Sequence, residues 1–162
     1  DEKGASSWTA TGETLSIAVA IQGVDPHDAA LEVLVCLGQA LWETLDQSKR
    51  REWLALLNTE IEHAVSGEID EDALHSKQKL MASPSAARSP HRLEEYAQAA
   101  FAGTVAEYVH ALWHDVTIRT GPSHLPAPWL RRRFELMLRW FPPDPGRKLF
   151  AETATWPHEP SP

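Results

Sequence analysis

Two Glu-x-x-His spacings are the pattern in this sequence that most suggests chemistry. The first joins Glu60 to His63. The second joins Glu107 to His110, and His114 follows four residues later. Residues three and four positions apart share one face of a helix, so these carboxylates and imidazoles could approach a common metal ion. Helical bundles that bind two metal ions use this spacing twice, which raises the hypothesis of a metal-binding helical-bundle enzyme.

The apolar pattern of the same region argues against a metal site. Apolar residues recur at helical spacing from Phe101 to Val116. At about 100° per residue, Glu107, His110 and His114 fall almost opposite this stripe. Side chains opposite a buried stripe normally face solvent. We therefore favour ordinary surface residues, expect no cofactor, and keep a bound metal ion as the alternative.

A basic cluster lies near the end of the chain and includes Arg131, Arg132, Arg133, Arg139, Arg147 and Lys148. Binding to nucleic acid favours basic residues on one helix face, whereas three consecutive arginines spread over about 200°. Arg132 and Arg139 share an exposed side. Together with Trp129 they are the candidate partner-binding residues, since Trp and Arg dominate interface hot spots. The favoured interpretation is a solvated face that forms salt bridges with the acidic first half.

The net charge of -8 and the pI of about 5.4 disfavour binding to nucleic acid or to an anionic membrane. The charge is unevenly distributed. Residues 1–80 carry 15 acidic and 6 basic side chains, whereas residues 119–150 carry 2 acidic and 7 basic ones. This asymmetry predicts that the two parts pack together, either within one chain or across an oligomer.

Several catalytic motifs are absent from the sequence. It contains no Gly-rich phosphate loop, no Gly-x-Ser-x-Gly elbow, no His-Glu-x-x-His zinc helix and no kinase motif. Cys36 is the single cysteine and lies in an apolar run, which predicts a buried, inert thiol. With no internal disulfide possible and no apolar run long enough to span a bilayer, we expect a cytoplasmic protein, with a secreted one as the alternative.

The longest predicted element is a helix from Ser89 to Ile118. Ser89 can cap its first turn, and Pro90 suits the first helical position. The sides away from the apolar stripe carry mostly small residues: Ala97, Ala99, Ala100, Ala102, Gly103, Ala106 and Ala111. Small residues let neighbouring backbones approach closely, so we expect other helices to pack on more than one side of it.

Helical periodicity also predicts helices over 25–46, 49–65, 68–81 and 129–140. The short break between the first two predicts an antiparallel hairpin or a sharply bent pair. Before them, Leu15, Ile17, Val19 and Ile21 alternate with small or polar residues, as in a strand. A lone strand in a helical chain would need a partner from a second copy. A short helix ending at Gly23 is the competing interpretation.

These patterns together predict an all-α fold: an irregular bundle of five or six helices around a long central helix (about 90–118), with a possible short N-terminal strand. We expect a single helical domain over 1–162. Its parts are an N-terminal arm (1–24), a helical hairpin plus a short helix (25–81), a linker (82–89), the central and last helices (90–150) and a Pro-rich tail (151–162).

The sequence points to no specific biochemical activity. The absent motifs, the charge asymmetry and the seven tryptophans favour a non-enzymatic, soluble protein-interaction or regulatory module that binds a protein partner or itself. Such a module should bury an interface that includes the last helix or the N-terminal arm. Besides the metal enzyme, the alternative is a small-molecule-binding helical domain with a pocket lined by tryptophans. Trp42, Trp53, Trp113 and Trp140 lie at or beside apolar stripes and are expected in the core or at its boundary.

Overall fold

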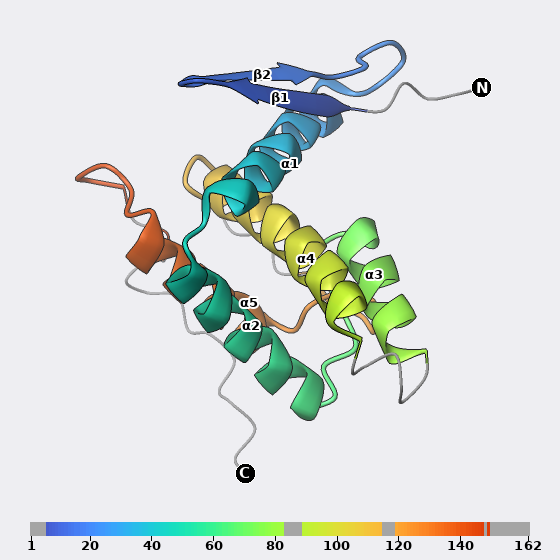
Figure 1. Cartoon of the computed structure of the whole chain (residues 1–162). Helices are drawn as coiled ribbons and strands as arrows, with labels where there is room; N and C mark the ends of the chain where they lie inside the picture. The colour runs from blue at the N-terminus through green and yellow to red at the C-terminus, as the bar shows by residue number, and fades with distance from the viewer. Residues whose placement is uncertain (1–5, 83–88, 115–118, 148, 150–162) are drawn as a thin grey trace.

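The computed structural model describes residues 6–82, 89–114, 119–147 and 149. These residues form five α-helices and one two-stranded antiparallel sheet at the N-terminal end (Figure 1). The elements are β1 (Ser7–Thr11), β2 (Thr14–Ala18), α1 (Pro26–Thr44), α2 (Gln47–Glu62), α3 (Glu71–Met81), α4 (Pro90–Ala111) and α5 (Ala127–Trp140). A mostly helical chain is therefore confirmed. No described helix is both long and apolar enough to cross a membrane.

The longest described helix, α4, contacts each of the four other helices (Figure 1). Nearly every residue from Tyr96 to Ala106 is buried, because small side chains allow neighbours on several sides. Gly38 of α1 lies so close to Ala102 of α4 that a Cβ atom on it would be 2.7 Å from the Ala102 Cα atom. The approach of these two helices therefore depends on Gly38.

Helix α4 is shorter than predicted. It ends at Ala111 instead of Ile118, and the N–H of Leu112 bonds to the carbonyl oxygens of Tyr108 and Val109 in the last turn. Trp113 follows in a turn with 68% of its surface exposed, so its expected place in or at the edge of the core is wrong. Val116 and the other residues of 115–118 lie outside the described residues.

The end of α2 and the start of α3 each differ from prediction by three residues. Helix α2 ends at Glu62, and Ala64 adopts a left-handed conformation (φ 54°) that a helix cannot include. Helix α3 begins at Glu71 because the backbone of Glu68 is bonded to another segment, through Ser123 and Leu125 at 3.0 Å each. Asp70 then caps α3 and accepts from the N–H of Ala73 at 2.8 Å.

The N-terminal arm forms a β-hairpin, which corrects the prediction that a strand here would have no partner in its own chain. Strand β1 comes from the first part of the predicted N-terminal arm (1–24) and pairs with β2. Residues 12 and 13 make the turn between Thr11 and Thr14, and Gly12 has the positive φ of 59° that such turns require. The alternating apolar pattern continues to Ile21, but the strand stops at Ala18. The interpretation of this stretch as a helix is wrong.

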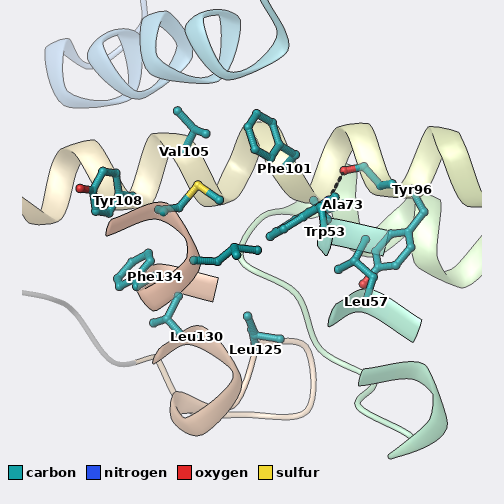
Figure 2. Packing of buried hydrophobic residues seen from close by; sticks show 14 of the residues in the cluster. Trp53, Leu57, Ala73, Tyr96, Phe101, Val105, Tyr108, Leu125, Leu130 and Phe134 are labelled. Carbon is teal, nitrogen blue, oxygen red and sulfur yellow. Dashed lines mark hydrogen bonds between the residues drawn. The ribbon is translucent and has the colours of Figure 1, made fainter. Parts of the chain in front are cut away.

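The hydrophobic core lies around α4, and Figure 2 shows buried side chains from several elements gathered there. Trp53 and Trp42 both pack against Phe101, with ring centroids 5.6 Å and 5.5 Å away. The indole N–H of Trp53 donates to the carbonyl oxygen of Ala97 at 2.9 Å. These aromatic contacts join α1 and α2 to the middle of α4.

Candidate functional site

The core holds a group of charged side chains that we call the buried charge cluster: Glu60 of α2, Glu68 before α3, Lys77 of α3, and Arg133 of α5, together with the hydroxyls of Tyr96 and Thr104 of α4. None of these residues is more than 3% exposed. Charged side chains are almost never fully buried unless they are paired. The ion pairs and hydrogen bonds among these side chains therefore determine the role of the cluster.

Arg133 lies at the centre of the cluster and forms bidentate hydrogen bonds with both carboxylates. Its Nε and Nη2 atoms donate to Glu60 at 2.8 and 2.6 Å, and its Nη1 and Nη2 atoms donate to Glu68 at 2.8 and 2.9 Å. Nη1 also lies 3.4 Å from the Thr104 hydroxyl oxygen, and Nη2 lies 3.3 Å from that of Tyr96. This planar donor set matches carboxylate geometry closely, and such charge-assisted bonds are the strong ones.

Glu68 connects Arg133 to the other half of the cluster. Lys77 donates to its Oε1 atom at 2.9 Å and to the carbonyl oxygen of Gly67 at 3.0 Å. The Tyr96 hydroxyl donates to the same carboxylate oxygen at 2.5 Å. Two acids thus face two bases, and the cluster is neutral as a whole.

The pKa shifts follow from this arrangement. Burial alone would raise the pKa of Glu68, but the charge and hydrogen bonds of Arg133, helped by Lys77, lower it to about 2. Burial likewise opposes the charge on Arg133, yet Glu68 and Glu60 raise its pKa above the usual value. Burial is also the main cause of the raised pKa of Tyr96. Glu68 and Arg133 are therefore held charged, and the phenol is held neutral.

The cluster is suited to holding the helices together rather than to catalysis. All five N–H groups of Arg133 have acceptors within the fold, and each carboxylate is bound by at least one base. A catalytic group must be reachable by a substrate, whereas these side chains are closed off from solvent. What the cluster connects is α2, α3, α4, α5 and the segment before α3.

Sequence reasoning placed Arg133 in an exposed basic cluster and missed its role. A signal for its position was present in the sequence. Leu130 lies three residues before Arg133 and Met137 four residues after it, and both are buried core residues. Residues at these spacings share a helix face. Arg133 therefore had to lie on the inner face of α5, where an arginine needs buried acids.

The residues of the predicted metal site are spread over different parts of the molecule. Glu60 belongs to the buried charge cluster. His63 lies at the end of α2, with its Nδ1 atom 2.8 Å from the carbonyl oxygen of Thr59 and its ring 5.3 Å from that of Trp129. Glu107 is half-buried beside a small cavity of about 30 Å³. The two Glu-x-x-His pairs therefore do not meet.

Two of the predicted ligands do lie together. The rings of His110 and His114 stack at 4.7 Å between centroids, and His27 at the start of α1 packs edge-on against His110 at 5.2 Å. The Nδ1 atom of His110 is buried and has no hydrogen-bond partner among the described residues. Among these residues, no group of three or more His, Cys, Asp or Glu side chains is arranged to hold a metal ion.

The predicted partner-binding residues have contacts within the chain. The guanidinium of Arg132 lies 4.4 Å from the ring centroid of Trp129. Arg139 donates to a carboxylate oxygen of Glu52 at 2.5 Å. Together with the bonds of Arg133 to Glu60, this salt bridge pairs the basic last helix with the acidic first half of the same chain, as the charge distribution predicted.

The largest of the described cavities is a cleft of about 480 Å³ between α1, α4 and the start of α3. Glu32, Asp70, Glu71 and Asp72 line it, and so does Cys36. The three acids at the start of α3 also suit the positive end of its dipole, which explains their presence without a ligand. Burial, with a smaller effect of Glu32, raises the pKa of the Cys36 thiol, so the thiolate is disfavoured. The predicted burial of this cysteine is confirmed.

A second, apolar pocket of about 240 Å³ lies between the end of α2 and α3. Ile61, Val65 and Met81 contribute to its walls. No tryptophan lines this pocket or the acidic cleft. The tryptophan-lined ligand pocket of the small-molecule hypothesis is therefore not found at either place.

The hairpin leaves both of its outer edges without a partner strand among the described residues, since the sheet has only β1 and β2. Its two faces differ. Trp8, Ala10, Leu15 and Ile17 share one face through the pairs Trp8 with Ile17 and Ala10 with Leu15. Trp8 and Ile17 are half-buried, and the hairpin packs against α1. Towards the turn, Leu15 is 36% exposed.

No protein-family model, curated protein or solved structure matches this chain. The fold and the candidate sites define a small, mostly helical protein with a charged core and an open-edged N-terminal hairpin. Of these two features, the charge cluster is buried, whereas the hairpin has no partner strand at its edges among the described residues.

Proposed function

We propose that this chain is a protein-interaction module whose docking element is the hairpin β1–β2 together with α1. The observation that carries the proposal is the edge of the hairpin, which has no partner strand in the described part of the chain. Backbone N–H and C=O groups at this edge could bond to another extended chain. Strand addition to a sheet edge is a recurring mode of peptide recognition: backbone bonds provide affinity and alternate side chains provide specificity.

Several further features support this assignment. Natural proteins usually protect edge strands with charged residues, proline or bulges. Neither β1 nor β2 contains a charged residue or a proline, and their pairing is regular from Ser7 to Ala18. A two-stranded hairpin is also marginally stable by itself, so an added strand would stabilise it.

Exposed apolar residues are concentrated at the same end of the molecule. Among the described residues, the large apolar side chains that stand exposed are Leu15, Ile21, Val33, Met81 and Trp113. The first three belong to the hairpin, the turn after it, and α1. In Figure 1 this unit lies at one end of the molecule, with the hairpin across the start of α1. Met81 and Trp113 lie elsewhere, at the end of α3 and after α4.

The test is a selection of short displayed peptides for binding to the whole protein, followed by affinity measurement on a variant with a blocked edge. Leu15→Pro removes one N–H from the outer edge of β2, and proline is tolerated at sheet edges. Leu15→Thr is the matched control, because it reduces apolar surface but keeps the N–H. We expect selected peptides to bind the wild type and Leu15→Thr, and to lose about tenfold or more in affinity for Leu15→Pro. Selected peptides that bind all three proteins equally would refute the proposal.

A further inference from the structure

Strand β2 has a sequence that complements itself when a second copy runs antiparallel to it. Its residues are Thr14, Leu15, Ser16, Ile17 and Ala18. Leu15 and Ile17 stand symmetrically on either side of Ser16. A two-fold axis through Ser16 therefore places Leu15 of each copy opposite Ile17 of the other, with all four side chains on the same face of the sheet.

The backbone of β2 offers the matching hydrogen-bonding groups. The two-residue turn makes Thr11 and Thr14 the closing pair of the hairpin, and such a pair is hydrogen-bonded. Bonding alternates along an antiparallel pair, so the N–H and C=O groups of Leu15 and Ile17 point away from β1, towards the free edge. About the axis through Ser16, these are the groups that meet, and they form four bonds between the copies.

Charge does not oppose this contact, although each copy carries a net charge of -8. The ten residues of β1 and β2 are uncharged, and the nearest acid is Glu13 in the turn. The same two-fold axis brings Glu13 to the level of Val19 of the second copy, away from its own counterpart. The paired strands themselves therefore bring no like charges together.

We propose that the partner of the hairpin is a second copy of this chain, and that two hairpins join through β2 into a four-stranded antiparallel sheet of order β1–β2–β2–β1. This inference rests on the proposed interaction function and names its partner. In the dimer, the exposed Leu15 packs against Ile17 of the second copy. Each α1 helix covers the apolar face of its own half of the sheet.

The experiment places charge on the symmetry axis. Ser16 is exposed and lies on the face of the hairpin opposite Leu15 and Ile17, so a charged residue there leaves the hairpin's apolar face intact. Two Ser16→Lys chains, or two Ser16→Asp chains, would place like charges directly opposite each other, which is unfavourable. We expect a dimeric wild type by analytical ultracentrifugation, and self-association at least about tenfold weaker for each variant.

Mixing the two variants supplies the decisive measurement. An equimolar mixture of Ser16→Lys and Ser16→Asp should restore dimers at the wild-type level, because the opposite charges now face each other. Thr9→Lys is the matched control: it carries the same charge on the same face but belongs to β1. It should leave the dimer unchanged, and circular dichroism should show unchanged helix content in all variants.

Three results would overturn the inference. A wild type that is monomeric at about 100 µM has no self-association of useful strength. If the Ser16→Lys and Ser16→Asp variants each dimerise as strongly as the wild type, the two-fold axis does not pass through Ser16. If only the Thr9→Lys variant loses the dimer, the contact between the copies is made by β1. The first result would remove the second copy as partner, while edge-dependent peptide binding would still support the interaction function.

Discussion

Replacing Arg133 by methionine tests the role of the buried charge cluster most directly. In the wild type the cluster contains two acids and two bases. Arg133→Met leaves one uncompensated negative charge, and it affects Glu60 most, because the hydrogen bonds described for the Glu60 carboxylate all come from Arg133. Removing one partner of a buried ion pair costs about 3–5 kcal/mol. That is a large part of the roughly 5–15 kcal/mol that stabilises an ordinary domain.

A second substitution distinguishes lost charge balance from lost packing. The double variant Glu60→Met/Arg133→Met removes both members of one buried ion pair and leaves Glu68 paired with Lys77, so the core is neutral again. Replacing a buried ion pair by apolar side chains of similar size is often neutral or stabilising. We therefore expect the double variant to recover at least about 2 kcal/mol relative to Arg133→Met, although it changes two core residues instead of one.

Urea unfolding followed by tryptophan fluorescence measures these differences, and Trp53 beside Arg133 makes the signal sensitive to this region. The pH dependence gives an independent reading. Arg133→Met should become more stable as the pH falls from about 7 to 5, because protonation removes the uncompensated charge. If Arg133→Met loses less than about 1 kcal/mol, or if the double variant is less stable than the single one, charge balance is not what Arg133 contributes to the core.

Three further predictions concern the core. Arg133 and Lys77 lower the pKa of Glu68 from 4.5 to about 2 despite burial. The ionised Glu68 should therefore contribute fully to the free energy of unfolding above about pH 5, and on the order of 3 kcal/mol should be lost as the pH falls to 2. Urea unfolding of the wild type at a series of acid pH values measures this loss. Gly38→Ala should lower the free energy of unfolding by about 1–3 kcal/mol, because the added methyl group pushes α1 away from Ala102. The control Asn58→Ala, on the exposed side of α2, should change it by no more than about 0.5 kcal/mol. Equal shifts of the melting temperature in the two variants would contradict the close approach of α1 and α4. Cys36 should not react with a thiol reagent at pH 8 in the folded protein and should react fully in denaturant; rapid labelling of the native state would contradict its burial.

The helical part of the fold could be predicted from the sequence because its signals are local. Asp25 and Ser89 cap helices at their predicted starts, and Asp46 caps α2 three residues before its predicted start. Asp70 caps α3 two residues after the predicted start. Boundaries set by contacts distant in sequence were not predictable in the same way. The start of α3 at Glu71 depends on backbone bonds between Glu68 and residues near 124, more than fifty positions away.

The hairpin and the charge cluster were missed for different reasons. Strand β1 contains Ser7, Thr9 and Thr11 on one face, so it lacks the apolar run that marks a buried strand, and its pairing becomes visible only through β2. For Arg133 the spacing to Leu130 and Met137 was informative, but three consecutive arginines pointed to a surface. Neither Glu60 nor Glu68 is near it in sequence, and only the folded chain shows that they meet.

The position of Arg133 along the chain also has a consequence for biosynthesis. Glu60 and Glu68 leave the ribosome well before α5 does, and until then the nascent chain lacks Arg133, which pairs with both acids in the folded protein. Since unpaired carboxylates resist transfer into an apolar interior, α2, α3 and α4 should stay loosely associated on the ribosome and lock together in one late step. Nascent chains halted just before α5 should accordingly remain sensitive to protease, and those that include it should become resistant.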